Sequence, residues 1–497
     1  MADVVVDAPT YMRDIRHFFD GVDLEHMLAR GIDLTTYPAL RAAATRVFQH
    51  TRPPNADMPP DPARRWSQER STTFRNWITT GLPLGTPDTA PVQPGTGDRI
   101  RKDARDLTDD EITTLRTAFQ GLMDRPGDAV TDRAPTADDN YFGWASVHGL
   151  PDPFECLHHE DRFLPWHRPM LIGFEDALRS VPGCEHVTLP FWDITAEPPA
   201  FLYTAPFSSF TLPRDIGDGF AAGDSTQRNS ATDVLTNVNK RNIPANINAA
   251  LSQFDWGTFR NTLEGGGHDN GHPSTGATMS NPEVATYDPI FWFFHANWDR
   301  LWWEWQQTMQ ATTEWTFRST ITDGQSDFLT SGFDDLPPFT TKVADTIDLA
   351  AAGVGYALAQ TPPPGPPRPS IAPLTFGSLA AARAITVQPQ RQASVRLKGI
   401  DRLAIPGTFE AVLSADGVPV ARQAFFQPIR PRECIGCREK GTINLDLMVD
   451  VDAIIGRDLT TTIQLLTPGA ERIGRTFPLS SCGNPTLNVR LPLQGQT

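Results

Sequence analysis

The residues with the clearest capacity for chemistry are the histidines, because eight of the eleven fall between positions 148 and 295. His268 and His272 are four residues apart, so on a helix both imidazoles would leave one face and could reach one ion. His167 and His295 each share a helical face with apolar residues, which would aim both rings at a core. A single histidine in such a place is usually a core residue, but six candidates in two groups of three favour metal ligands. Imidazole-only ligation suits copper, zinc or iron, and two groups indicate a pair of metal ions.

The elements that must position these histidines are mainly helical. Thr108 precedes acidic residues and then apolar residues at helical spacing, which marks a helix start. From there to about residue 360 the pattern stays mainly helical, with long loops. Beyond residue 370, segments such as SVRLKGI and GTINLDLMVDVDA alternate apolar and polar residues, as half-buried antiparallel strands do. The sequence therefore predicts a mainly α domain followed by an all-β sandwich.

The run TPPPGPPRPS, which can continue neither a helix nor a central strand, is the best domain boundary in the chain. We expect an N-terminal extension packed on the core (1–95), a metal-binding catalytic domain (96–360), a Pro-rich linker (361–374) and a C-terminal β-sandwich (375–497).

Composition excludes several classes of function. The formal net charge of −16 argues against nucleic acid as a partner, because phosphate binding needs a basic surface. No window approaches eighteen uninterrupted apolar residues, and the N-terminus has acids where a signal peptide needs positive charge. We therefore expect no membrane partner and a cytoplasmic protein. Five cysteines are too few and too scattered for a disulfide framework.

Several motifs closely resemble the type 3 copper proteins, the superfamily of tyrosinases, polyphenol oxidases (catechol oxidases) and hemocyanins. The two copper-binding regions of that superfamily are similar to HHEDRFLPWHR, FRNTLEG, HDNGH and DPIFWFFHANWDRLW. RIRKDARDLT resembles the helix with which the family's domain begins, VTLPFWD its middle segment, and VADTIDLAAAGVGYAL the tyrosine motif that closes the domain. The resemblance covers about residues 100 to 360 and implies a four-helix-bundle dicopper core with long loops.

The resemblance also implies which residues hold the metal. Two copper ions would be bound, the first by His148, His158 and His167 and the second by His268, His272 and His295. The family spaces its second and third ligands of the first copper nine residues apart, which selects His158 over its neighbour. His159 and His186 are then spare histidines. No organic cofactor is required.

Other residues near the copper ions take roles from the same resemblance. Cys156 is either a small buried thiol or, as in fungal tyrosinases and molluscan hemocyanins, a partner of His158 in a thioether crosslink. Glu264 corresponds to the family's water-holding glutamate. Asp269 stands where hydroxylating members often carry Asn; it could take the phenol proton or couple with Glu264 so that one pKa rises. Asp299 is expected to hydrogen-bond a ligand imidazole or its helix.

In this superfamily a C-terminal β-domain often covers the copper site, so the chain is expected to be latent until cleavage, acid or detergent loosens that cover. Cys434 and Cys437 form a C-x-x-C pair suited to Cu(I) and to copper loading. A structural turn or a disulfide, involving Cys482 in one version, is an equal alternative.

The resemblance implies a bacterial-type tyrosinase or polyphenol oxidase, which hydroxylates monophenols to o-diphenols and oxidises o-diphenols to o-quinones with O2. The alternatives are a catechol oxidase or o-aminophenol oxidase without monophenolase activity, and a hemocyanin-like O2 carrier. A small phenol and O2 are the expected partners, and a homo-oligomer is compatible with the sequence.

Overall fold

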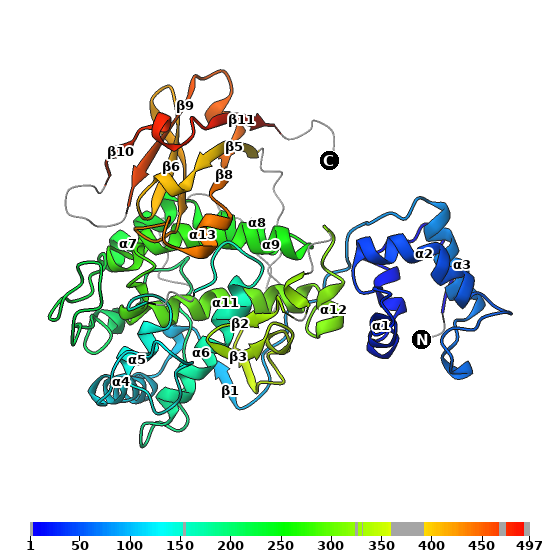
Figure 1. Ribbon diagram of the computed structural model, residues 1–497, viewed down its shortest axis with the longest axis horizontal. Helices are drawn as coiled ribbons and strands as arrows, with labels where there is room; N and C mark the ends of the chain where they lie inside the picture. The colour runs from blue at the N-terminus through cyan, green and yellow to red at the C-terminus, as the bar shows by residue number, and fades with distance from the viewer. Residues whose placement is uncertain are drawn as a thin grey trace, which may run out of the picture.

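The computed structural model describes residues 3–152, 156–323, 327–330, 332–358, 392–466 and 474–491. Its described parts are a group of N-terminal helices, a helical core and a C-terminal β-domain (Figure 1). The predicted Pro-rich linker, 361–374, lies outside the described residues, so the proposed boundaries on either side of it stay predictions.

Three short helices make up the N-terminal part, and they have a hydrophobic core of their own. They are α1 (Gly21–Leu28), α2 (Tyr37–Thr51) and α3 (Gln68–Thr79). Their N-caps are polar side chains that accept a backbone N–H, as the first turn of a helix requires. Phe74 and Trp77 are fully buried in this core, against which Trp315 of the helical core also packs. Figure 1 shows these helices at the side of the core, next to α12 (Glu314–Arg318).

The helical core contains the longest helices of the described chain. Its remaining helices are α4 (Asp109–Asp124), α5 (Tyr141–Ser146), α6 (Phe163–Arg179), α7 (Ala231–Lys240), α8 (Ile243–Leu251), α9 (Trp256–Leu263), α10 (Asn270–Thr275) and α11 (Ile290–Thr308). Thr108 begins α4 with a capping box to Glu111, which confirms the predicted helix start. Helices α6 and α11 pack on each other, and nearly all of α11 is buried.

The segment RIRKDARDLT does not form the helix expected from the resemblance. Arg99–Arg101 is strand β1, which pairs in parallel with β4 (Val354–Tyr356). A single 3-10 turn follows at Ala104–Asp106, and an α-helix begins only at Asp109. The extended backbone carries the fully buried Arg101 side chain to Glu175, to which its Nε donates over 2.7 Å. The only other strands described before residue 392 are β2 (Asp335–Leu336) and β3 (Phe339–Lys342), a small antiparallel pair.

The C-terminal part folds into two antiparallel sheets, which confirms the predicted β fold. One sheet has the order β10-β9-β6-β7 and the other β11-β5-β8. Their bounds are β5 (Gln392–Asp401), β6 (Phe409–Ala415), β7 (Val418–Phe425), β8 (Thr442–Asp450), β9 (Leu459–Leu465), β10 (Thr476–Phe477) and β11 (Thr486–Arg490), with helices α13 (Ile435–Glu439) and α14 (Val451–Ile454) between strands. Asp416 and Gly417 both have positive φ, as the tight turn of the β6–β7 hairpin requires.

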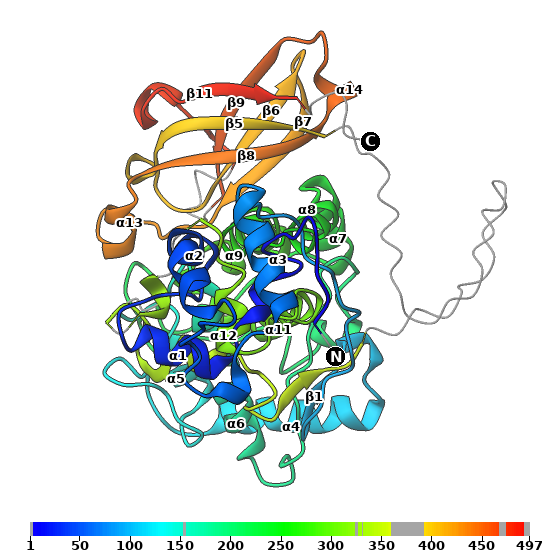
Figure 2. The same cartoon turned by 90° about the vertical axis from the view of Figure 1, so that its right-hand side faces the viewer.

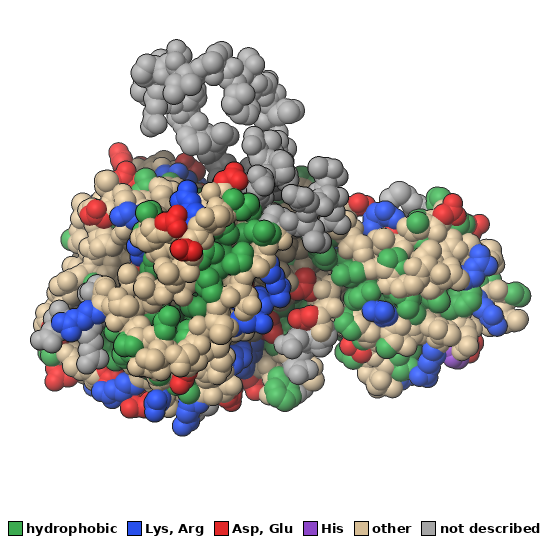
Figure 3. Space-filling model, turned by 90° about the horizontal axis from the view of Figure 1, so that it is seen from above, with side chains coloured by type: hydrophobic (Ala, Val, Ile, Leu, Met, Phe, Trp, Pro, Cys, Tyr) green, Lys and Arg blue, Asp and Glu red, His purple; other side chains and the backbone are tan. Residues whose placement is uncertain are grey.

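The β-domain lies over the helical core, with strand β7 nearest to it (Figures 1 and 2). The backbone N–H of Ala424 donates to the Asn270 side chain over 2.7 Å, and Arg241 pairs with Glu410 over 3.1 Å. Seen from above, the β-domain and the N-terminal helices both show apolar side chains among charged ones (Figure 3). The contacts fix the end of β7 beside the residues that follow α9, where two of the predicted ligands lie.

Among the residues that the structure describes, none of the helices combines the length and apolar character that a membrane span requires.

Candidate metal centre

The six histidines predicted as ligands converge in the helical core from six different segments. His167 lies on α6, His272 on α10 and His295 on α11. His268 lies on a π-helical turn, Glu264–Asp269, rather than on the regular helix that its spacing from His272 predicted. The other two, His148 and His158, lie in irregular segments outside any helix.

The structure arranges these rings as two adjoining groups of three. Ring centroids are 5.4 to 5.6 Å apart within the group of His148, His158 and His167, and 4.5 to 5.6 Å apart within the group of His268, His272 and His295. In each group, one nitrogen of every ring lies within 4.8 Å of the others. The two groups meet where His167 stacks on His295, with a centroid separation of 4.3 Å.

Hydrogen bonds from the outer nitrogens orient four of the six rings. The Nδ1 atoms of His148, His167 and His272 face backbone carbonyl oxygens of Pro282, Phe163 and Met279 at 2.7 to 3.1 Å. Nδ1 of His268 faces Oδ1 of Asp269 at 3.0 Å. An Nδ1–H donated outwards leaves the lone pair on Nε2, which is how proteins orient imidazoles that bind metal.

The inward-facing nitrogens fit two metal ions. Nε2 of His268 and Nε2 of His272 are only 2.9 Å apart, about the separation of two ligands at right angles on an ion about 2.0 Å from each. Among the described residues, Nε2 of His167 and both ring nitrogens of His295 are buried without a hydrogen-bond partner. Burial lowers the pKa of all six imidazoles, which keeps them neutral as metal ligands must be. A donor set made only of imidazoles suits copper.

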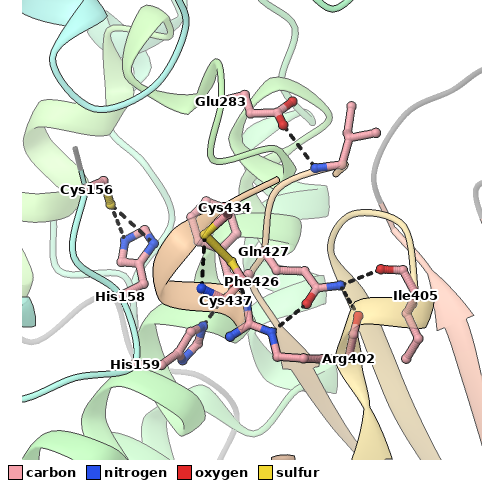
Figure 4. Close-up of a disulfide and its surroundings, with 11 residues drawn as sticks. Cys156, His158, His159, Glu283, Arg402, Ile405, Phe426, Gln427, Cys434 and Cys437 are labelled. Atoms are coloured by element: carbon pink, nitrogen blue, oxygen red, sulfur yellow. Dashed lines mark hydrogen bonds between the residues drawn. A yellow bond between two sulfur atoms is a disulfide. The ribbon is translucent and has the colours of Figure 1, made fainter. Parts of the chain in front are cut away.

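Cys156 lies against the edge of the His158 ring (Figure 4). Its Sγ is 3.3 Å from Nδ1 and 3.1 Å from Nε2, so it faces Cε1, the carbon between the two nitrogens. The thiol is buried, and burial raises its pKa. The structure therefore brings together the two residues predicted to form a crosslink.

Glu264 and Asp269, the predicted proton-handling carboxylates, are both about 1% exposed and lie at the two ends of the π-helical turn. Burial raises the pKa of Glu264 to about 7, and Arg260, which donates to Oε2 over 3.2 Å, opposes that rise. Burial also raises the pKa of Asp269, and the charge of Glu264 raises it further. The two carboxylates are thus coupled, as the sequence suggested.

His159 and His186 stay outside both groups, as expected for spare histidines. His186 is exposed. His159, however, is close to the predicted site: its backbone N–H donates to Glu264 over 2.5 Å, and its ring stacks on Phe425 with a centroid separation of 4.1 Å. No pattern in the sequence indicated that this histidine contacts the β-domain as well as the core.

Asp299 does not bond a ligand imidazole, which was one of two expected roles. It accepts hydrogen bonds from Nε of Arg168 at 2.6 Å and from the Tyr356 hydroxyl at 2.5 Å, and Arg101 lies 3.3 Å away. Arg168 follows His167 on α6, so Asp299 fixes the helix of a predicted ligand, the second expected role, through an arginine. This buried network joins α6, α11, β1 and β4.

Phe426, just after β7, is the residue near the site that sequence reasoning missed. Its ring stacks on His272 with a centroid separation of 3.8 Å and an angle of 15° and lies 5.2 Å from His158. Phe425 and Phe426 point to opposite sides, as consecutive residues of an extended chain do, so one reaches His159 and the other the dinuclear site. The consecutive apolar residues Phe425 and Phe426, which break the alternation of β7, were the sequence signal that could have pointed to this contact.

Cys434 and Cys437 form a disulfide, one of the alternatives left open by the sequence. Arg402 donates to Sγ of Cys437 over 3.2 Å (Figure 4). Cys482 is buried and takes no part in this disulfide. In this form neither sulfur is a thiolate, so a role of the pair in copper loading requires prior reduction.

Comparisons with known proteins find a matching family, related chains and similar solved structures. The family described as the common central domain of tyrosinase matches residues 138–212 and 200–308. The chain is 31% identical over 178 residues to tyrosinase HcTyr1 of Hahella sp., covering 30% of this chain and 37% of that protein. It is 30% identical over 236 residues to hemocyanin 2 of Megathura crenulata, covering 42% of this chain but 6% of that protein. Among solved structures, the tyrosinase from Burkholderia thailandensis matches with a TM-score of 0.57 and 18% identity over 81% of this chain and all of that one.

Proposed function

Since residues 138–308 carry the common central domain of tyrosinase, the chain belongs to the family of type 3 copper proteins that includes tyrosinases and hemocyanins, and we propose that it oxidises phenols with O2. The observation that carries this proposal is the convergence of six neutral, oriented imidazoles in two adjoining groups beside a buried glutamate. The reactions proposed are hydroxylation of monophenols to o-diphenols and oxidation of o-diphenols to o-quinones.

His148, His158 and His167 would hold one copper ion, and His268, His272 and His295 the other. When bound, the pair would supply the binding and reduction of O2. The outer hydrogen bonds of these rings limit their rotation, so the inward nitrogens are already placed before metal binds.

The position of Phe426 supports an aromatic substrate. Its ring lies flat on His272, so a phenol ring of the same shape would fit the same space once Phe426 leaves. The site beneath it is apolar and enclosed, since Phe163, Phe291 and Phe294 also contact the ligand rings. These contacts would exclude water and hold the phenol in one orientation.

Glu264 would accept the proton of an incoming phenol. A phenol has a pKa near 10 and binds a metal well only after losing its proton, so a positioned base matters. With a pKa raised to about 7, Glu264 is a stronger base than an ordinary glutamate. Asp269 would take a second part, because its Oδ1 accepts a hydrogen bond from Nδ1 of His268 and so orients that ring.

A bond between Cys156 and His158 is part of the same proposal. Joining Sγ to Cε1 breaks the S–H and C–H bonds and releases two protons and two electrons, which O2, the oxidant of the proposed reaction, would take up to give hydrogen peroxide. The crosslink would hold the His158 ring, which lies in an irregular segment, in one orientation.

The β-domain would keep the protein latent, because Phe426 occupies the substrate position. A cytoplasmic location, a homo-oligomeric state and the absence of nucleic-acid and membrane partners stay predictions from the sequence.

A second candidate function is that of a hemocyanin-like O2 carrier, and it is favoured by the stacking of Phe426 on His272. The Phe426 ring stacked over the site would exclude a phenol, and hemocyanins match the chain as well as tyrosinases do.

The deciding experiment supplies copper-loaded wild type and Phe426→Ala with tyrosine, catechol and o-aminophenol. Catechol formed from the monophenol supports the full proposal. Quinone from catechol alone reduces it to a catechol oxidase, and product from o-aminophenol alone to an aminophenol oxidase. Reversible O2 uptake without turnover in either protein would establish the carrier.

A further inference from the structure

Three electron-pair donors, from His159, Glu264 and Asp269, meet beside the two histidine groups. Nδ1 of His159 lies 3.8 Å from Oε1 of Glu264 and 3.8 Å from Oδ2 of Asp269. One ligand atom from each of these residues lies within 4.8 Å of the other two. Both carboxylates are about 1% exposed and the His159 side chain 16%, so bulk water does not separate these atoms.

The remaining polar atoms of the three residues already have partners. Nε2 of His159 donates to the carbonyl oxygen of Phe426 over 2.9 Å. Oε2 of Glu264 accepts from Arg260, and Oδ1 of Asp269 faces Nδ1 of His268. With its proton on Nε2, a neutral His159 directs the Nδ1 lone pair at two carboxylate oxygens. Oε1 of Glu264 also accepts the His159 backbone N–H, and Oδ2 of Asp269 accepts the Phe426 N–H over 3.4 Å, but each carboxylate oxygen keeps a second lone pair. A cation among the three acceptors would relieve their mutual repulsion.

The backbone holds His159 in this position at a cost. It has a φ of 60°, in the left-handed region that residues other than Gly, Asn and Asp seldom adopt. Three contacts maintain the conformation: the backbone N–H donates to Glu264, the carbonyl accepts from Lys440 over 2.8 Å, and the ring stacks on Phe425. A backbone carbonyl on the outer nitrogen is also the usual support of a metal-binding imidazole.

We propose that His159, Glu264 and Asp269 form a third metal site, separate from the dinuclear centre, which takes a divalent ion such as Zn²⁺. If the two carboxylate oxygens are as far from each other as each is from Nδ1, a point equidistant from all three lies about 2.2 Å from each, close to the length of zinc bonds to nitrogen and oxygen. One imidazole and two carboxylates suit zinc, with water completing the coordination.

The charges around the cluster are compatible with one divalent ion. Two carboxylates at this depth are balanced by Arg260 on Glu264 and by the nearby Arg402, which have an attractive interaction with them. Arg260 contacts the oxygen of Glu264 that points away from His159, so the ion and the arginine use different oxygens. The His159 ring is held by the carbonyl oxygen of Phe426, which follows β7, so the site forms fully only when the β-domain is docked. The ion would therefore belong to the docked, latent state, and Glu264 would serve as the base proposed for phenols only after the ion has left.

The test measures zinc in the full, copper-loaded chain. The protein is dialysed against Zn²⁺, washed, and analysed for copper and zinc by mass spectrometry. We expect one zinc ion per chain with the copper content unchanged, and a zinc X-ray absorption spectrum with one imidazole and oxygen ligands. His159→Asn should lose the zinc and keep the copper, since Asn adopts the left-handed backbone readily.

His186→Asn is the matched control, because it removes an exposed histidine outside the cluster; it should keep the zinc. Failure to bind zinc in the wild type would overturn the proposal. Zinc retained by His159→Asn, or zinc that displaces copper, would overturn it too. Because copper is counted separately, failure of the third site is distinguishable from failure of the dinuclear one.

Discussion

Replacing Phe426 with alanine should open the dinuclear site to phenols. The side chain is 1% exposed and stacks on His272 with its centroid 3.8 Å away. A buried phenylalanine removes about 150–250 Å² from water, which at about 25 cal/mol per Å² amounts to about 4–6 kcal/mol as an upper estimate. Replacements of buried phenylalanine by alanine cost about 3–5 kcal/mol. A phenol must displace this ring before it can bind.

If displacement costs about 3–4 kcal/mol, the ring lowers phenol affinity by about 100- to 1,000-fold. Phe426→Ala should therefore lower KM for catechol by about that factor, and kcat should change much less, because the ligands and Glu264 are untouched. The assay follows quinone formation by copper-loaded full-length protein, with copper content measured in each sample.

Phe425→Ala is the matched control, since this neighbouring ring stacks on His159 rather than on a predicted ligand. It should loosen the β-domain without emptying the substrate position, so its KM should fall far less. Equal KM values for wild type and Phe426→Ala at equal copper content would refute the view that this ring blocks the site.

Three more predictions concern other residues. Glu264→Gln should lower monophenol hydroxylation at least about 100-fold, the usual effect of a lost general base, and catechol oxidation much less. In the wild type, hydroxylation should rise as pH rises through about 7, where the Glu264 carboxyl loses its proton. Equal losses of both activities in Glu264→Gln would contradict this role. Glu283 accepts the N–H of Ile429 in the β-domain, and burial raises the pKa of Glu283 to about 7. The docked state therefore binds this proton more tightly than a released state with the ordinary pKa of 4.5, so docking weakens as pH rises between these two values. Glu283→Gln should flatten the pH dependence of latency, and an unchanged profile would contradict this role. Intact copper-loaded protein, after removal of the metal, should be about 4 Da lighter than its sequence, about 2 Da from the Cys434–Cys437 disulfide and about 2 Da from the crosslink. Cys156→Ser should keep only the deficit of the disulfide, and three free thiols in the wild type, those of Cys156, Cys184 and Cys482, would exclude the crosslink.

The hydrogen bond from the Ile429 N–H to Glu283 bears on the expectation that acid loosens the β-domain. The sequence suggested that acid would loosen the cover, but a carboxyl whose pKa is raised on docking favours the docked state at low pH. Its neighbours act in both directions: Asp218 raises this pKa, while Arg430, Asn281 and the Ile429 N–H lower it. Burial is the largest cause, so the net effect of this residue is release by alkali.

Local patterns predicted the features that depend on local structure. The apolar faces around His167 and His295 placed both rings in the core, and the cap at Thr108 placed the start of α4. The alternating strands predicted the β-domain. The resemblance to type 3 copper proteins added His148 and His158, which lie in irregular segments and have no periodicity of their own.

The features that escaped prediction are contacts between distant parts of the chain. His159 bonds Phe426 across 267 positions, and no local pattern encodes that pairing. The position of Phe426 over His272 likewise depends on how β7 docks. Residues Glu264–Asp269, just before His272, form a π-helical turn, whereas the spacing of His268 and His272 predicted a regular α-helix.

The measurement that tests the central claim most directly is the number of copper ions bound per chain. The account predicts two in the wild type, one in His167→Ala, one in His295→Ala and two in the control His186→Ala, with catechol oxidation only in the proteins that hold two. Fewer than two copper ions in the wild type, or two in either ligand variant, would contradict the assignment of one copper to each group of three histidines.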